Sequence, residues 1–248
     1  MTGEPLPVFV HVLKTGGTSV REAFYANAKG RPFLDVLLQV PGEDLHGLPL
    51  GWHTRHQDVT GLVGAARKHQ HELAYLLVNL PYGVHRYLSR DVCYLSMLRE
   101  PVARAVSYLY FTHNNHPEVW DRFVALDLDA ERLVSEASAF TLANAQIRAL
   151  TGTTDIWLDK SHLEHAQTVV RNEFGFVGAI ERFDESLDRL ADLLGWANRP
   201  HPRLNIGDYR DAGLVPSRTV DQLRALNEYD AALHEWLLDE YLPATLST

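Results

Sequence analysis

Short apolar runs alternate with longer amphipathic segments along the whole chain, and this alternation limits the possible folds more than any other feature. Four runs rich in Val, Leu, Phe and Tyr are predicted strands, at 7–12, 72–78, 92–98 and 174–180. Helical spacing predicts helices near 18–28, 58–70, 101–113, 119–136, 138–150, 160–172, 184–194 and 217–240. The pattern predicts an α/β fold with a central, mainly parallel sheet flanked by helices.

The 248-residue chain contains no internal repeat, low-complexity tract or dividing linker, which predicts one domain over 1–248. Two segments, 29–57 and 196–216, carry Gly, Pro and His without clear periodicity. Segments of this length are either functional loops, such as lids or substrate walls, or disordered.

The formal charge is −9, with no long block of either sign. This argues against a broad surface for nucleic acid or anionic membrane but leaves room for a local basic pocket. No apolar stretch approaches the ~20 residues of a membrane span, and the first residues lack a signal-peptide pattern. We therefore expect a cytoplasmic protein without nucleic-acid or membrane partners; the sequence leaves its oligomeric state open.

The stretch HVLKTGGTSV, residues 11–20, lies between a predicted strand and a predicted helix. Backbone N–H groups of a glycine turn and of a helix start form a concave anion site, to which hydroxyls add donors and a lysine adds charge. The residues predicted to bind a phosphate-bearing cofactor here are Lys14, Thr15, Gly16, Gly17, Thr18 and Ser19. The loop of nucleotide triphosphatases places its lysine after the last glycine, whereas Lys14 precedes both.

A second motif lies in LSMLREPVARAVSYLYF, where a predicted strand ends at Arg99 and Pro101 suits the first turn of a helix. Arg99 supplies a fork of donors and Ser107 a hydroxyl, and both can bind one phosphate. Arg104 can serve the same phosphate, but a helix arginine is more often a solvated charge or an ion-pair partner, in this case of Glu100.

Together, K-T-G-G-T-S and R-E-P-x-x-R-x-x-S resemble the 5′-phosphosulfate loop and the 3′-phosphate motif of the sulfotransferase family that includes heparan sulfate 2-O-sulfotransferase and soluble bacterial relatives. Segments 144–152, 176–196 and 226–236 are also similar to that family. The resemblance implies a P-loop-like sulfotransferase fold. It further implies transfer of a sulfuryl group from 3′-phosphoadenosine 5′-phosphosulfate (PAPS) to an acceptor hydroxyl without a metal, leaving 3′-phosphoadenosine 5′-phosphate (PAP). In this resemblance Lys14 is catalytic.

The same family commonly carries a histidine, proposed as the catalytic base, before a turn that contains proline. Here the matching segment is VNLPYGVH, and Asn79 stands at the histidine position. Asparagine cannot accept a proton near neutral pH, so another base is needed, or an acceptor that ionises easily. His85 is the nearest substitute, followed by His53 and His56. Asn79 and Tyr82 are predicted to contact the substrate.

The acceptor is expected to be a small molecule or a saccharide. A phenol or an activated alcohol is favoured over a polysaccharide, because it loses its proton more readily and the net charge repels polyanions. Two alternatives stay open, a catalytically impaired PAP- or PAPS-binding protein and a P-loop nucleotide kinase. The thirteen histidines form close pairs without a complete ligand set, so no metal site is predicted.

Overall fold

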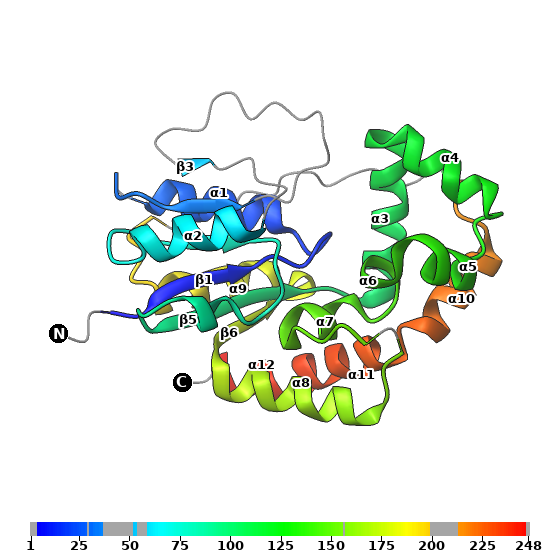
Figure 1. The fold of residues 1–248 in the computed structure, drawn as a ribbon. Helices are drawn as coiled ribbons and strands as arrows, with labels where there is room; N and C mark the ends of the chain where they lie inside the picture. The colour runs from blue at the N-terminus through cyan, green and yellow to red at the C-terminus, as the bar shows by residue number, and fades with distance from the viewer. Residues whose placement is uncertain are drawn as a thin grey trace.

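The computed structural model describes residues 4–28, 30–36, 52–53, 59–155, 157–198 and 213–246. This part of the chain forms a parallel sheet of six strands in the order β3-β2-β4-β1-β5-β6 (Figure 1). The strands are β1 (Leu6–Val10), β2 (Leu34–Val36), β3 (Trp52–His53), β4 (Leu76–Val78), β5 (Val92–Leu98) and β6 (Phe174–Ala179). The predicted α/β class with a parallel central sheet is confirmed.

All four predicted strands are present, although β4 is confined to 76–78. The prediction that 29–57 lacks regular structure is wrong in part, because β2 and β3 lie within it. Strands of three and two residues are too short to show a period of two in the sequence. Most of the second irregular segment, 196–216, lies outside the described residues.

The helices flank the sheet, and one group of them lies beyond the carboxyl ends of its strands (Figure 1). They are α1 (Gly17–Asn27), α2 (Val59–His69), α3 (Pro101–Asn115), α4 (Pro117–Ala125), α5 (Ala130–Leu133), α6 (Ala139–Leu142), α7 (Ala145–Thr151), α8 (Lys160–Glu173), α9 (Phe183–Leu193), α10 (Ser217–Leu226), α11 (Glu228–Trp236) and α12 (Leu242–Leu246). Short 3-10 helices cover Val84–Tyr87 and Ile180–Arg182. No helix in the described ranges is long and apolar enough to cross a membrane.

Two of the long predicted helices divide where the backbone turns left-handed. The segment predicted as 119–136 breaks between α4 and α5, where Asp127 and Leu128 have φ values of 59° and 49°. The segment predicted as 138–150 breaks before α7, where Asn144 has a φ of 45°. A right-handed helix cannot continue through such residues.

The apolar side chains form two buried cores. The larger core contains the central strands, with Phe9, Leu77 and Leu95 fully buried. The smaller core lies among α3, α4, α5, α6 and α10, which Figure 1 shows grouped beyond the sheet. Helix α3 therefore starts at the end of β5 and passes into a second packed unit, which fixes its direction relative to the sheet.

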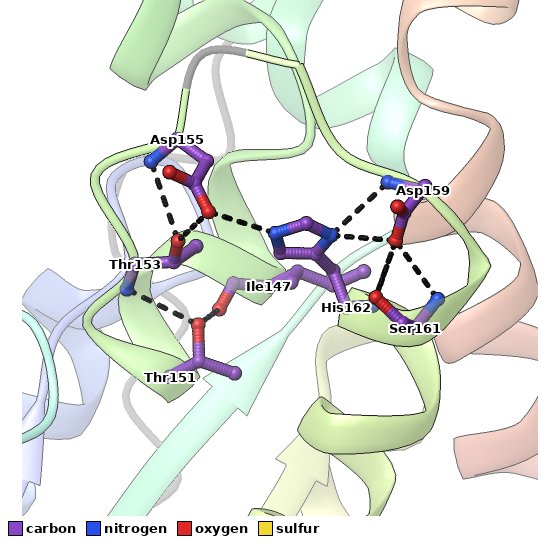
Figure 2. A network of polar contacts seen from close by, with 7 residues as sticks. All are labelled: Ile147, Thr151, Thr153, Asp155, Asp159, Ser161 and His162. Carbon is purple, nitrogen blue, oxygen red and sulfur yellow. Dashed lines mark hydrogen bonds and ion pairs between the residues drawn. The ribbon is translucent and has the colours of Figure 1, made fainter.

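The loop before α8 is held by a network around His162 (Figure 2). The Asp159 carboxylate caps α8 by accepting from the backbone N–H of Ser161 at 2.9 Å. His162 Nδ1 lies 2.8 Å from Asp159 Oδ1, and its Nε2 lies 3.0 Å from Asp155 Oδ2. These two carboxylates raise the pKa of His162 through hydrogen bonds. Protonated imidazole can donate to both carboxylates at once, so the carboxylates favour the charged form.

Candidate functional site

A tight turn connects β1 to α1 and contains the predicted phosphate loop. Its path requires left-handed backbone at Lys14 (φ 71°) and at Gly16 (φ 76°). A Cβ atom at Gly16 would lie 2.5 Å from the Ile180 side chain, and one at Gly17 would overlap the His11 ring. Gly17 is therefore required by the His11 ring and Gly16 by its backbone angle, since the Ile180 methyl can move aside.

The start of α1 presents its positive end to this turn. The first hydrogen bond of the helix runs from the backbone N–H of Val20 to the Gly16 carbonyl, at 3.2 Å. Gly16 is the N-cap residue and supplies no side-chain cap, and the first turn of α1 contains no acidic residue. The backbone N–H groups of Gly17, Thr18 and Ser19 precede that first helical bond, as expected for an anion site.

Lys14 lies in this turn with its ammonium group 4.4 Å from the centre of the Phe111 ring, which belongs to α3. Burial, and then the charge of Arg99, lower the pKa of Lys14 to about 8. Neither cause is opposed by a described carboxylate. The site thus concentrates positive charge in a partly dry environment, which a bound anion would stabilise.

Arg99 follows β5 and joins the second predicted motif to the first. Its guanidinium Nη1 donates to the Lys14 carbonyl oxygen at 3.3 Å. Residues 85 positions apart in the sequence therefore meet at the carboxyl edge of the sheet. In open parallel sheets this is the edge at which ligands bind.

Two buried polar side chains on α3, the helix that follows Arg99, have no hydrogen-bond partner in the described chain. Ser107 is 2% exposed and its Oγ is unpartnered; Arg104 is fully buried and all three of its guanidinium nitrogens are unpartnered. The suggestion of a solvated Arg104 or of a pair with Glu100 is wrong. Glu100 instead caps α3, accepting from the N–H groups of Val102 and Ala103 at 3.0 and 2.6 Å.

A polar network centred on Arg21 lies beside the turn and connects α1 to β2 and to the end of β4. Arg21 of α1 donates to the Asn79 amide oxygen at 2.9 Å and lies 2.8 Å from His11 Nδ1, while its Nε pairs with Asp35 at 3.1 Å. The Asn79 oxygen also lies 2.7 Å from His11 Nδ1. Burial, and then the Arg21 charge, lower the pKa of His11 to about 3, so the imidazole is neutral and weakly basic. Asn79 thus lies beside His11, which precedes the phosphate loop, and its oxygen accepts from Arg21.

Tyr82 and His85 lie elsewhere. The Tyr94 hydroxyl accepts from the His85 backbone N–H at 2.9 Å and lies 2.9 Å from His85 Nδ1. The Tyr82 ring packs on Tyr94, with centres 4.8 Å apart, and also on Phe174, the first residue of β6. Tyr94 precedes the end of β5 by four residues, or about 13 Å of strand. These contacts of Tyr82 and His85 are thus with Tyr94 and Phe174, and none of them is with Lys14 or Arg99.

His53, the other predicted base, forms the end of the edge strand β3, and its side chain is outside the described part of the structure, as is His56. In the described ranges, no group of three or more His, Cys, Asp or Glu side chains is arranged to hold a metal ion.

No family model matches the chain, and no curated protein matches it significantly.

Proposed function

We propose that this protein is a sulfotransferase that uses PAPS. The observation that carries the proposal is the bond from Arg99 to the Lys14 carbonyl, because it joins the two predicted phosphate motifs at one edge of the sheet. In this proposal residues 14–19 bind the 5′-phosphosulfate, and Arg99 with Ser107 binds the 3′-phosphate.

The residues of the site suit a ligand with two phosphate groups. The uncapped start of α1 and the unpartnered Ser107 hydroxyl supply donors, and Lys14 and Arg99 supply charge. The nearby acidic side chains have other partners: Asp35 pairs with Arg21 and accepts from Tyr25, and Glu100 caps α3. Donors and cations thus outnumber free carboxylates, which favours PAPS over a nucleotide held through magnesium.

Bound PAPS would supply the sulfuryl group. With a pKa of about 8, about nine tenths of Lys14 is charged at pH 7, so its ammonium can stabilise the oxygen from which the sulfuryl group departs. The N–H groups at the start of α1 would hold the remaining oxygens. Arg99 and Ser107 would fix the nucleotide so that Lys14 faces the reacting bond.

The proposed acceptor is a phenol or an activated alcohol. The Asn79 oxygen is bonded to Arg21, His11 is a weak base, and His85 is bonded to Tyr94. The described contacts therefore supply no free and strongly basic histidine for an acceptor at Lys14. An acceptor that ionises near pH 10 needs less help than a sugar hydroxyl. The same observation favours a second candidate function, a PAP- or PAPS-binding protein without transfer activity.

Two measurements test these proposals. Calorimetric titration compares PAP with ATP plus magnesium, and tighter binding of ATP would replace the sulfotransferase proposal by the kinase alternative. Transfer of radiolabelled sulfate from PAPS to phenols, sugars and amines then separates enzyme from binding protein. We expect tighter binding of PAP and transfer to phenols; PAP binding without any transfer would favour the second candidate.

A further inference from the structure

The peptide groups of Arg99 and Glu100 connect β5 to α3 and are each held by a side chain from elsewhere in the fold. Gln146 accepts from the Arg99 N–H and donates to the Arg99 carbonyl, both at 2.9 Å. Glu181 Oε1 accepts from the Glu100 N–H at 2.7 Å. Pro101 follows without an N–H group. These three side-chain bonds therefore pair backbone groups that have no partner in the sheet or in the helix, and so fix the path of the chain between β5 and α3.

Gln146 and Glu181 are both bonded to residues of α11, which Figure 1 shows beside α7 and α8. The Asp230 carboxylate accepts from the backbone N–H groups of Gln146 and Ile147, each at 2.9 Å, at the start of α7. His234 Nε2 lies 3.0 Å from Glu181 Oε2. Asp230 and His234 are four residues apart and so share one face of α11.

Two asparagines complete the connection between α7 and α11. The Asn144 N–H donates to the Asn227 side chain at 2.9 Å, and the Asp230 N–H donates to the Asn144 side chain at 2.9 Å. Gln146, Asn227 and Asp230 are all fully buried. A buried and mutually bonded polar cluster of this kind is rigid, since any movement leaves a polar group unpaired.

From this geometry we infer that Gln146 and Glu181 are positioning residues for the anion site. An arginine side chain reaches a ligand only as accurately as its backbone is placed, and the junction beside Arg99 is placed by these two side chains. They keep the Arg99 guanidinium within reach of the Lys14 carbonyl and of an anion bound at the turn. The identity of that anion as PAP rests on the proposed function.

The decisive variant is Gln146→Met, which keeps the side-chain volume and removes both bonds to Arg99. We expect PAP affinity, measured by calorimetry, to fall about tenfold. The matched control is Gln70→Met. Gln70 is also buried and also accepts from backbone N–H groups, those of Ser89 and Arg90 at 2.7 and 2.8 Å, but it is remote from α3. It should lose stability and leave PAP affinity unchanged.

A double variant separates positioning from general stability. In an Arg99→Ala background, Gln146→Met should weaken PAP binding by less than twofold, because the group that it positions is gone. The inference is wrong if Gln146→Met binds PAP like the unaltered protein, if Gln70→Met weakens binding equally, or if the two losses multiply in the double variant.

Hydrogen exchange of the Arg99 and Glu100 amides tests the same contacts without a ligand. Gln146→Met should speed exchange at Arg99, and Glu181→Ala at Glu100, at least tenfold; unchanged rates would overturn the inference. If the unaltered protein failed to bind PAP, the proposed function would be wrong. The exchange rates would still test whether Gln146 and Glu181 position the backbone at Arg99. Should Gln146→Met fail to fold, Glu181→Ala carries the test, since 35% of that side chain is exposed.

Discussion

The guanidinium of Arg99 donates a hydrogen bond to the carbonyl oxygen of Lys14, at 3.3 Å. Lys14 is one of four non-glycine residues with positive φ in the described chain, and its carbonyl would turn easily without a partner. The arginine thus has two tasks: it offers charge to a ligand and fixes the turn that binds it.

Removing this side chain should weaken PAP binding more than an ordinary surface charge would. We expect Arg99→Ala to lower PAP affinity about 10- to 100-fold in calorimetric titrations, because a charge-assisted bond is lost. Arg122→Ala, which removes an exposed arginine on α4, is the control and should leave affinity unchanged. Equal affinities for all three proteins would exclude Arg99 from the anion site.

Lys14→Ala should suppress sulfate transfer far more than it weakens PAP binding, because the ammonium acts mainly on charge that develops during the reaction. We expect transfer to a phenol to fall at least 100-fold in a radiolabel assay. A loss confined to the Michaelis constant for PAPS, with kcat retained, would contradict a catalytic role for Lys14.

PAP affinity should fall as the pH rises above about 8. Burial and Arg99 lower the pKa of Lys14 to about 8 in the free protein, and a bound anion raises it again. Below pH 8 the lysine is already charged and affinity is flat; above pH 8 binding takes up a proton, so affinity falls up to about tenfold per pH unit. Calorimetry in buffers of different ionisation enthalpy measures this uptake. Lys14→Arg, which stays charged, should bind without it.

The network in Figure 2 should stabilise the protein most between about pH 4 and pH 6.5. Hydrogen bonds from Asp155 and Asp159 raise the pKa of His162, so its contribution is complete below 6.5 and is lost as pH rises through the raised value. Bonds from Ser161 and His162 lower the pKa of Asp159 to about 2, so that contribution is complete above 3.8 and lost on acidification. Thermal unfolding of His162→Gln should differ most from the unaltered protein at pH 5, and a constant difference from pH 3 to 9 would refute the assignment.

Gly17→Ala should destabilise the fold and weaken PAP binding together. The added methyl overlaps the His11 ring, which is held by Asn79 and Arg21, and overpacking of this kind costs about 1–3 kcal/mol. Gly64→Ala in α2 is the matched control, because a methyl there meets no atom within 4 Å. It should raise stability by about 0.5–1 kcal/mol. Similar melting temperatures for the two variants would show that the His11 ring can move aside.

The sequence predicted the features that depend on local pattern. The strands with long apolar runs, the glycine turn after β1 and the start of α3 at Pro101 all appear where spacing and residue type indicated. Strands β2 and β3 were missed because two or three residues carry no period. The break at Asn144 was missed because an asparagine in left-handed backbone looks like any polar helix residue.

Features that depend on distant partners could not be predicted. His85 follows Asn79 by six residues, yet its imidazole contacts the hydroxyl of Tyr94, which no local signal indicates. The sequence favours a surface charge at Arg104, yet the side chain is fully buried, and the charge of Asp230 on α11 acts on it. The bonds from Gln146 to Arg99 join residues 47 apart, and no local signal marks them.

The depressed pKa of Lys14 has a consequence for chemical labelling. At neutral pH an amine whose pKa is about 8 is uncharged about 300 times more often than one near 10.5, and only the uncharged amine attacks acylating reagents. A dilute amine-reactive reagent should therefore modify Lys14 faster than a lysine of ordinary pKa, and a ligand that occupies the turn should protect it, which provides an assay of site occupancy before any acceptor is known.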